Sequence, residues 1–156
     1  MKTSLIFILA LINLSFFAID KKDIYKALSG NSFQEIDNLI VKLEAQESNS
    51  LNRIYKGSLI AKSAEFEKST AKKISKFKIG VQLLESEIAA FPKETEYRFL
   101  RLCIQEHCPK ILKYNKNITE DVSLIITNYS KQPTKLKSII RDYAKTSKSL
   151  DYTLLK

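Results

Sequence analysis

The chain has 156 residues, of which 44% are hydrophobic, and a formal net charge of +9 at pH 7. This hydrophobic content is too high for a disordered protein, in spite of the charge. Only three glycines and three prolines occur, and no Asn-Gly, Asp-Gly or Gly-Gly pair is present to form a tight hairpin turn, so the composition excludes a typical β-sheet protein.

The amino terminus has the pattern of a secretory signal. Lys2 supplies a positive charge, residues 4–19 are almost all apolar, and charged residues follow from Asp20 onward. These sixteen apolar residues would span about 24 Å as a helix, which is less than the roughly 30 Å hydrocarbon core of a bilayer. The segment therefore predicts an exported protein that is periplasmic, associated with the cell envelope or secreted.

The processing of this segment has two alternatives. We expect residues 1–19 to be a signal peptide, but bulky Phe16 occupies a position where cleavage after Ala18 requires a small residue. An uncleaved anchor is therefore the alternative. A buried helix of a cytosolic domain is disfavoured because the apolar run has no amphipathic period.

The remaining sequence predicts a single helical domain over residues 20–146, followed by a tail over 147–156 whose order is left open. Asp20 can cap a first helix that stops at Gly30, and Ser32 with Glu35 forms a capping box for a second. Apolar residues then recur at helical spacing. In chain order these stripes are Phe33, Ile36, Leu39, Ile40 and Leu43; Leu51, Ile54, Tyr55 and Leu59; Ile74, Phe77, Val81, Leu84 and Ile88; Tyr97, Leu100 and Ile104; Val122, Ile125, Ile126 and Tyr129; and Leu136, Ile139, Ile140 and Tyr143.

Breaking residues separate these helices. The cluster at 48–50 precedes the third, Phe91-Pro92 ends the fourth, Pro109 ends the fifth, and Pro133 opens the seventh. We expect the fourth and fifth helices to form a central hairpin. Its apolar residues would be Leu84, Ile88, Leu100 and Ile104.

The predicted fold class is all-α, built from antiparallel helical hairpins. A TPR-like right-handed array and an irregular bundle of about six to seven helices are the two forms considered. Gly57 and Gly80 resemble the small residues that pack one helix of such a repeat on the next, and Pro92 resembles its closing proline. Their spacing, however, is not that of a standard repeat.

Residues 96–121 carry a more specific resemblance. The segment is similar to one found in small exported helical proteins of Bacteroidetes, which implies a TPR-like fold and a cell-envelope address but no activity. The chain departs from that pattern at Cys103 and Cys108. The resemblance rests on Arg98, Phe99, Leu100, Arg101, Leu102, Ile104, Gln105, Pro109, Leu112, Tyr114, Asn117, Ile118 and Asp121.

Cys103, His107 and Cys108 are the densest group of potential ligands or nucleophiles. A structural zinc site needs four such ligands, and the chain has only these two cysteines and this one histidine. No third group is placed to orient a Cys–His nucleophile. A disulfide between the two cysteines requires the helix to unwind before Pro109, because residues five apart on a helix lie about 8.6 Å apart. Two free thiols are the equal alternative.

No other motif indicates an enzyme. The sequence contains no Gly-rich phosphate loop, no HExxH and no GxSxG pattern. We therefore expect a protein that is not an enzyme, with no catalytic residues, no metal and no cofactor.

The positive charge is concentrated in two regions. Residues 68–78 carry five lysines and no acid, and residues from His107 to the end carry ten basic and four acidic side chains. These regions suit an anionic partner, although a solvated lysine face is the simpler interpretation. The first region consists of Lys68, Lys72, Lys73, Lys76 and Lys78.

Two functions follow as hypotheses. The first is a non-catalytic helical scaffold that binds a protein or peptide in a groove between helix pairs. The alternative is a peripheral binder of anionic envelope material, such as lipid head groups, an anionic glycan or an acidic protein. Nucleic acid is disfavoured as a partner by the export signal.

Overall fold

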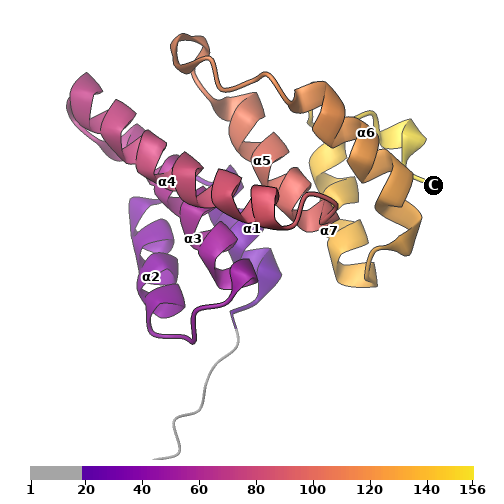
Figure 1. Ribbon diagram of the computed structural model, residues 1–156, viewed down its shortest axis with the longest axis horizontal. Helices are drawn as coiled ribbons and strands as arrows, with labels where there is room; N and C mark the ends of the chain where they lie inside the picture. Colours follow the sequence, from indigo (N-terminus) through magenta and orange to yellow (C-terminus); the bar gives the residue numbers. More distant parts are fainter. Residues whose placement is uncertain (1–18) are drawn as a thin grey trace, which may run out of the picture.

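The computed structural model describes residues 19–156, and within this range the chain forms seven α-helices and no strand (Figure 1). The predicted all-α fold is thereby confirmed. The predicted signal segment lies outside the described residues apart from Ile19, which packs against the core. None of the helices between residues 19 and 156 is long and apolar enough to cross a bilayer.

The helices begin and end close to the predicted breaks. They are joined by short loops, several of which contain a turn of 3-10 helix. In chain order they are α1 (Lys21–Ser29), α2 (Phe33–Glu44), α3 (Ser50–Ser63), α4 (Thr70–Ala90), α5 (Thr95–His107), α6 (Ile118–Asn128) and α7 (Thr134–Ala144), with 3-10 turns η1 (Ala64–Phe66), η2 (Lys110–Leu112), η3 (Tyr129–Lys131) and η4 (Tyr152–Leu154).

Polar side chains cap the first four helices. The Asp20 carboxylate accepts a hydrogen bond from the Lys22 amide at 2.8 Å, and the Ser32 hydroxyl accepts one from the Glu35 amide at 3.3 Å. Asn49 and Ser69 do the same for α3 and α4. Each bond satisfies one of the amides that the first turn of a helix leaves free.

The tightest helix contact joins α3 and α4, which run antiparallel. A Cβ atom added to Gly80 would lie 2.3 Å from the backbone nitrogen of Ala61 and 2.6 Å from the carbonyl oxygen of Gly57. The two backbones therefore touch, and position 80 has no room for a side chain. The two glycines thus allow α3 to pack directly on α4.

The prediction that α4 and α5 form the central hairpin is wrong. α4 packs chiefly on α3, and α5 packs chiefly on α6 and α3. The physical reason is the glycine pair, which lets the backbones of α3 and α4 come into direct contact. The four apolar residues expected in that hairpin are nevertheless all buried, namely Leu84, Ile88, Leu100 and Ile104.

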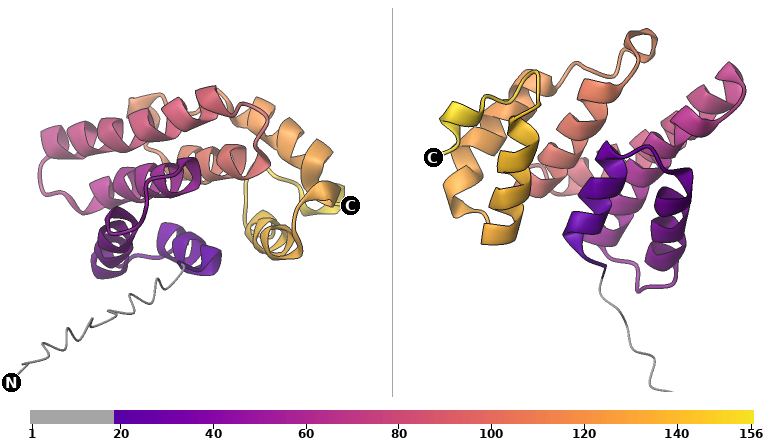
Figure 2. Two further views of the ribbon diagram at one scale, coloured as in Figure 1. Left: turned by 60° about the horizontal axis from the view of Figure 1, so that its bottom comes forward. Right: turned by 180° about the vertical axis from the view of Figure 1, so that it is seen from behind.

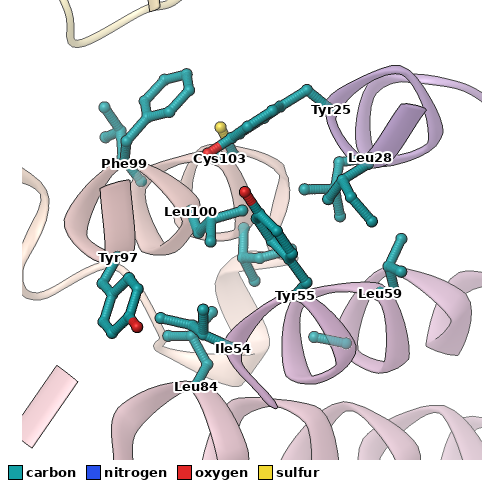
Figure 3. Close-up of a cluster of buried hydrophobic side chains, with 14 of the residues drawn as sticks. Tyr25, Leu28, Ile54, Tyr55, Leu59, Leu84, Tyr97, Phe99, Leu100 and Cys103 are labelled. Carbon is teal, nitrogen blue, oxygen red and sulfur yellow. The ribbon is translucent and has the colours of Figure 1, made fainter. Parts of the chain in front are cut away.

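One hydrophobic core extends through all seven helices. Figure 3 shows its centre, where Tyr25 of α1 and Tyr55 of α3 extend toward α5. α1 and α7 lie on the same side of α3 and α5 (Figure 2), and Lys135 of α7 pairs with the Asp20 carboxylate at 2.7 Å. The first and last helices of the fold are thus neighbours.

The carboxy-terminal tail, whose order the sequence left open, packs on the helices. Leu150 and Leu155 are buried, and Asp151 caps the short turn η4. The Arg141 guanidinium donates to the carbonyl oxygen of Leu155 at 3.3 Å. The tail is therefore part of the helical domain.

The glycine contact leads to a testable prediction. Gly80→Ala should destabilise the protein by about 2 kcal/mol. The new methyl group would push α3 and α4 apart, and the free-energy cost of this overpacking should exceed the gain of about 1 kcal/mol from alanine's higher helix propensity. The free energy of unfolding in urea measures this. Ser75→Ala on the exposed side of α4 is the control, with a change within about 0.5 kcal/mol. A Gly80→Ala protein as stable as the parent would contradict the close contact.

Candidate functional site

A groove with a volume of about 460 Å³ lies between α1, α5 and α7. Tyr25 and Tyr143 contribute aromatic walls, Leu28 and Ile139 contribute apolar surface, and charged side chains stand at its edge. The groove exists because α7 returns to the side of α1 without filling the space in front of α5. Its lining is Lys22, Tyr25, Lys26, Leu28, Ser29, Cys103, His107, Ser138, Ile139, Asp142, Tyr143 and Thr146.

A second, more apolar cavity of about 160 Å³ adjoins the groove. The two share Leu28, Cys103 and His107, so the residues around Cys103 separate two parts of one concave surface. Apolar side chains of α3, η1, α4, α5 and the segment after α5 complete it. They include Ala61, Ala64, Phe77, Ile104, Cys108, Pro109 and Leu112, with Lys62, Glu65 and Lys73 as the charged members.

His107 stands at the junction of the two cavities with a fixed orientation. Its Nδ1 atom lies 2.9 Å from the carbonyl oxygen of Cys103, which can only accept, so Nδ1 carries the proton of this hydrogen bond. The ring also packs edge-on against Tyr143 with 6.5 Å between centroids. Only Nε2 is left for a partner in the groove.

Both cysteines are free thiols in the structure. Cys103 is buried, and burial raises the pKa of its thiol well above the usual range. Burial also raises the pKa of Cys108. Protonated thiols are poor nucleophiles, which works against covalent chemistry at this position. α5 ends at His107 and Cys108 is extended, so the unwinding that a disulfide needs begins there, and the pairing stays a prediction.

The structure provides no cluster for a metal ion within residues 19–156, where no three His, Cys, Asp or Glu side chains come together suitably. His107 and Cys103 belong to the groove, but the Nδ1 of His107 is occupied by the backbone. The arrangement therefore offers a binding surface with a single free imidazole nitrogen.

A buried carboxylate holds α1 in place as one wall of the groove. Glu96 on α5 is buried and accepts hydrogen bonds from the Tyr55 hydroxyl and from the Lys21 ammonium group. Burial raises the pKa of Tyr55, and the nearby Glu96 carboxylate adds to this effect. α1, α3 and α5 are tied together at one point, beside the groove.

A second buried network lies on the opposite side of α5. Arg101 donates two hydrogen bonds to the fully buried Asp121 carboxylate at 2.8 and 2.6 Å, and Arg98 adds a third at 3.1 Å. Arg101 also reaches Glu85 on α4 at 2.9 Å, and the Tyr114 hydroxyl bonds the same carboxylate. This network of ion pairs and hydrogen bonds thus connects four elements, namely α4, α5, α6 and the loop between α5 and α6.

The residues that carry the family resemblance are mostly components of this packing. Arg98, Phe99, Leu100, Arg101, Leu102, Ile104 and Gln105 are all buried on α5, and Asp121 is their buried partner on α6. Leu112, Tyr114 and Ile118 pack partly buried against the core, Asn117 precedes α6, and Pro109 follows α5. Of these residues only Ile104, Pro109 and Leu112 line a cavity of the groove.

Glu106 closes the far end of the groove by holding the carboxy-terminal segment. Its carboxylate accepts hydrogen bonds from the Tyr143 hydroxyl, the Ser147 hydroxyl and the amides of Lys148 and Ser149. Burial alone would raise the pKa of Glu106, but these hydrogen bonds lower it below the usual value. The segment after α7 is therefore anchored by one ionised carboxylate.

The five lysines of the first basic region do not form one face. Lys73 lines the smaller cavity, while Lys68 and Lys72 line a separate depression beside Phe33 and Phe66. Lys76 pairs with Glu67 at 2.9 Å and lies over the ring of Phe33, and Lys78 is exposed. The structure thus distributes these charges around the amino-terminal half of α4.

Comparison with known proteins gives no relative: no protein-family model, curated protein or solved structure matches the chain.

Sequence reasoning missed most of the groove. Tyr25, Tyr143 and Glu106 have ordinary helical positions in the sequence, and nothing in their spacing indicates that α1 and α7 meet. Charged residues beside a buried stripe were the available signal, since Glu96 and Glu106 lie at either end of the apolar residues of α5. This pattern suggests that the charges are buried, but it does not indicate which residues pair with them.

The Glu106 anchor predicts a specific pH dependence. A depressed pKa means that the carboxylate stabilises the fold above its unfolded pKa, about 4.3, and that this contribution is lost as pH falls through the lower folded value. Glu106→Gln should therefore cost about 1–3 kcal/mol at pH 7 and progressively less below pH of about 4. Thermal melts across this range measure it. Glu47→Gln, exposed between α2 and α3, is the control, and equal pH profiles for Glu106→Gln and the parent would contradict the anchor.

Proposed function

We propose that the protein is a non-catalytic helical scaffold of the cell envelope that binds a protein or peptide segment in the groove between α1, α5 and α7. The observation that carries this proposal is the pair of adjoining cavities with an apolar floor, two tyrosine walls and a polar edge. Buried apolar anchors surrounded by a polar rim are typical of sites that bind peptides.

The chemistry of the groove favours binding over catalysis. The Cys103 thiol is buried with a raised pKa, and the Nδ1 of His107 is engaged by a backbone carbonyl. Tyr143 is half-buried and offers a stiff aromatic contact surface, of a kind that is frequent in the energetically dominant part of protein interfaces, whereas Tyr25 is 9% exposed and contributes little area. We also propose that the helix pairs are of the TPR-like type, with the Gly57–Gly80 contact as support.

We propose that the protein is exported, on the basis of the sequence pattern of residues 1–19. Expression with the native amino terminus should deliver it to the envelope, with a mature start near Ile19. An intact chain bound to the envelope would select the uncleaved anchor, and a full-length cytoplasmic product would contradict export.

A second candidate function is the peripheral binding of anionic envelope material. The observation in its favour is that Lys68, Lys72, Lys73 and Lys78 are exposed around the start of α4. Salt separates the two functions. Binding through lysines should collapse at high ionic strength, whereas binding in the apolar groove should persist.

The groove is tested by filling it. Peptides selected from a random library on the purified protein should bind the parent at high salt, and Ser138→Trp should weaken the binding at least about tenfold because the indole would occupy the groove. Thr127→Trp on the exposed side of α6 is the matched control and should bind like the parent. Equal affinity for both variants would show that the selected peptides bind elsewhere and would contradict the groove.

A further inference from the structure

The fold brings together two basic segments that are distant in sequence. Residues 68–84, at the start of α4, and residues 109–117, between α5 and α6, contain eight lysines and no aspartate or glutamate. The rings of Phe77 and Tyr114 meet edge to face with 5.6 Å between centroids, so the two segments are neighbours. We call these two segments together the basic end.

The basic end projects from the molecule. The first turns of α4 and the loop between α5 and α6 extend beyond the other helices on the same side (Figures 1 and 2). Their charges face solvent. Lys68, Lys72, Lys73, Lys78, Lys113 and Lys116 are exposed, and of these six none has a carboxylate within 4.0 Å in the described part of the chain.

Apolar side chains stand among these lysines. Ile111 is 83% exposed, the highest value among the large hydrophobic residues of the described chain, and Ile79 is 54% exposed. Lys113, two residues after Ile111, has a φ of 51°, a left-handed conformation that is uncommon for a residue with a side chain. At 83% exposure Ile111 contributes little to the packing of the described chain and is available to an external partner.

We propose that the basic end docks on the surface of a lipid bilayer that contains anionic head groups. The lysines would lie against the head groups, and Ile111 would enter the boundary between head groups and acyl chains. This inference rests on the second proposed function, the binding of anionic envelope material. The basic end borders the smaller cavity through Lys73, Phe77 and Leu112, and the variants used below leave these three residues unchanged.

Shape decides between a bilayer and other anionic partners. A folded acidic protein would need a complementary hollow to receive a projecting loop and helix end, whereas a bilayer accepts any convex surface that carries cations around an apolar tip. A soluble polyanion would satisfy the lysines but would leave Ile111 in water. The combination of free lysines and exposed aliphatic side chains therefore fits a lipid surface best.

The absence of tryptophan from the sequence allows a local test in the full chain. In the Ile111→Trp protein, emission should shift to shorter wavelength with vesicles of equimolar phosphatidylcholine and phosphatidylglycerol, because the indole leaves water. Pure phosphatidylcholine should give no shift, and about 1 M salt, with a Debye length of roughly 3 Å, should reverse it. Val41→Trp, at a position that is 57% exposed on α2, should not shift with either vesicle.

The lysines are tested in the Ile111→Trp background. Lys68→Gln, Lys72→Gln, Lys78→Gln and Lys116→Gln together should raise the lipid concentration for half-saturation at least about a hundredfold, since each lysine near an anionic surface contributes about fivefold. The control replaces four exposed lysines outside the basic end, so that it has the same net charge as the first four-lysine variant. It should stay within about threefold of the parent by the same measure. Its changes are Lys42→Gln, Lys93→Gln, Lys131→Gln and Lys148→Gln.

Three results would overturn the inference. One is an equal loss of binding in the two four-lysine variants. Another is an emission shift in the Val41→Trp protein with no shift in the Ile111→Trp protein. The third is binding to dextran sulfate with no response to vesicles, which would leave the broader proposal of an anionic partner intact while removing the bilayer. Residues 1–18 are common to every protein compared, so a contribution from them cannot produce these differences.

Discussion

The structure depends on the burial of α5 from all sides. Every residue from Thr95 to Gln105 is buried, including the charged residues Glu96, Arg98 and Arg101. A buried charge without a partner costs several kcal/mol, so each of these side chains must find an opposite charge or a hydrogen-bonding group on a neighbouring element. The positions of the other helices follow from this requirement. Gln105 is the exception, because its amide has no hydrogen-bonding partner within the described chain.

The partners come from every side of the molecule. Lys21 and Tyr55 meet Glu96 and fix α1 and α3, while Asp121 receives both arginines and fixes α6. Glu106, at the end of α5, fixes the segment after α7 through hydrogen bonds with its backbone amides. The groove is the space left between two elements, α1 and α7, that are each anchored to α5 separately. Polar contacts therefore determine the positions of the groove's walls, and buried core residues form its floor.

The sequence predicted the helices well and their packing less well. Asp20, Ser32 and Gly30 mark helix ends by local chemistry that does not depend on the rest of the chain. α5 was harder to place in three dimensions, because a helix buried on every side has no polar face. Its stripe of Tyr97, Leu100 and Ile104 indicated one contact surface where the structure has several. The glycines likewise suggested that two helices approach closely, but the sequence did not indicate that α4 packs chiefly on α3 and not on α5.

The candidate surfaces illustrate the same limit. The groove joins residues from the start, middle and end of the chain, and no local pattern links Tyr25 with Tyr143. The basic end combines two lysine-rich segments that are separated by 24 residues in the sequence. Long-range juxtaposition of this kind depends on the packing of whole helices, which a single sequence does not specify.

The most direct test of the account is the energetic coupling between Arg101 and Asp121. Arg101→Met and Asp121→Leu should each destabilise the fold by about 3 kcal/mol or more, because each leaves a buried charge without its main partner. The double variant, unfolded in urea beside the two single variants, should lose at least about 2 kcal/mol less than their sum. Losses that add within about 0.5 kcal/mol would show that the pair is not coupled and would contradict the organising role of the charges on α5.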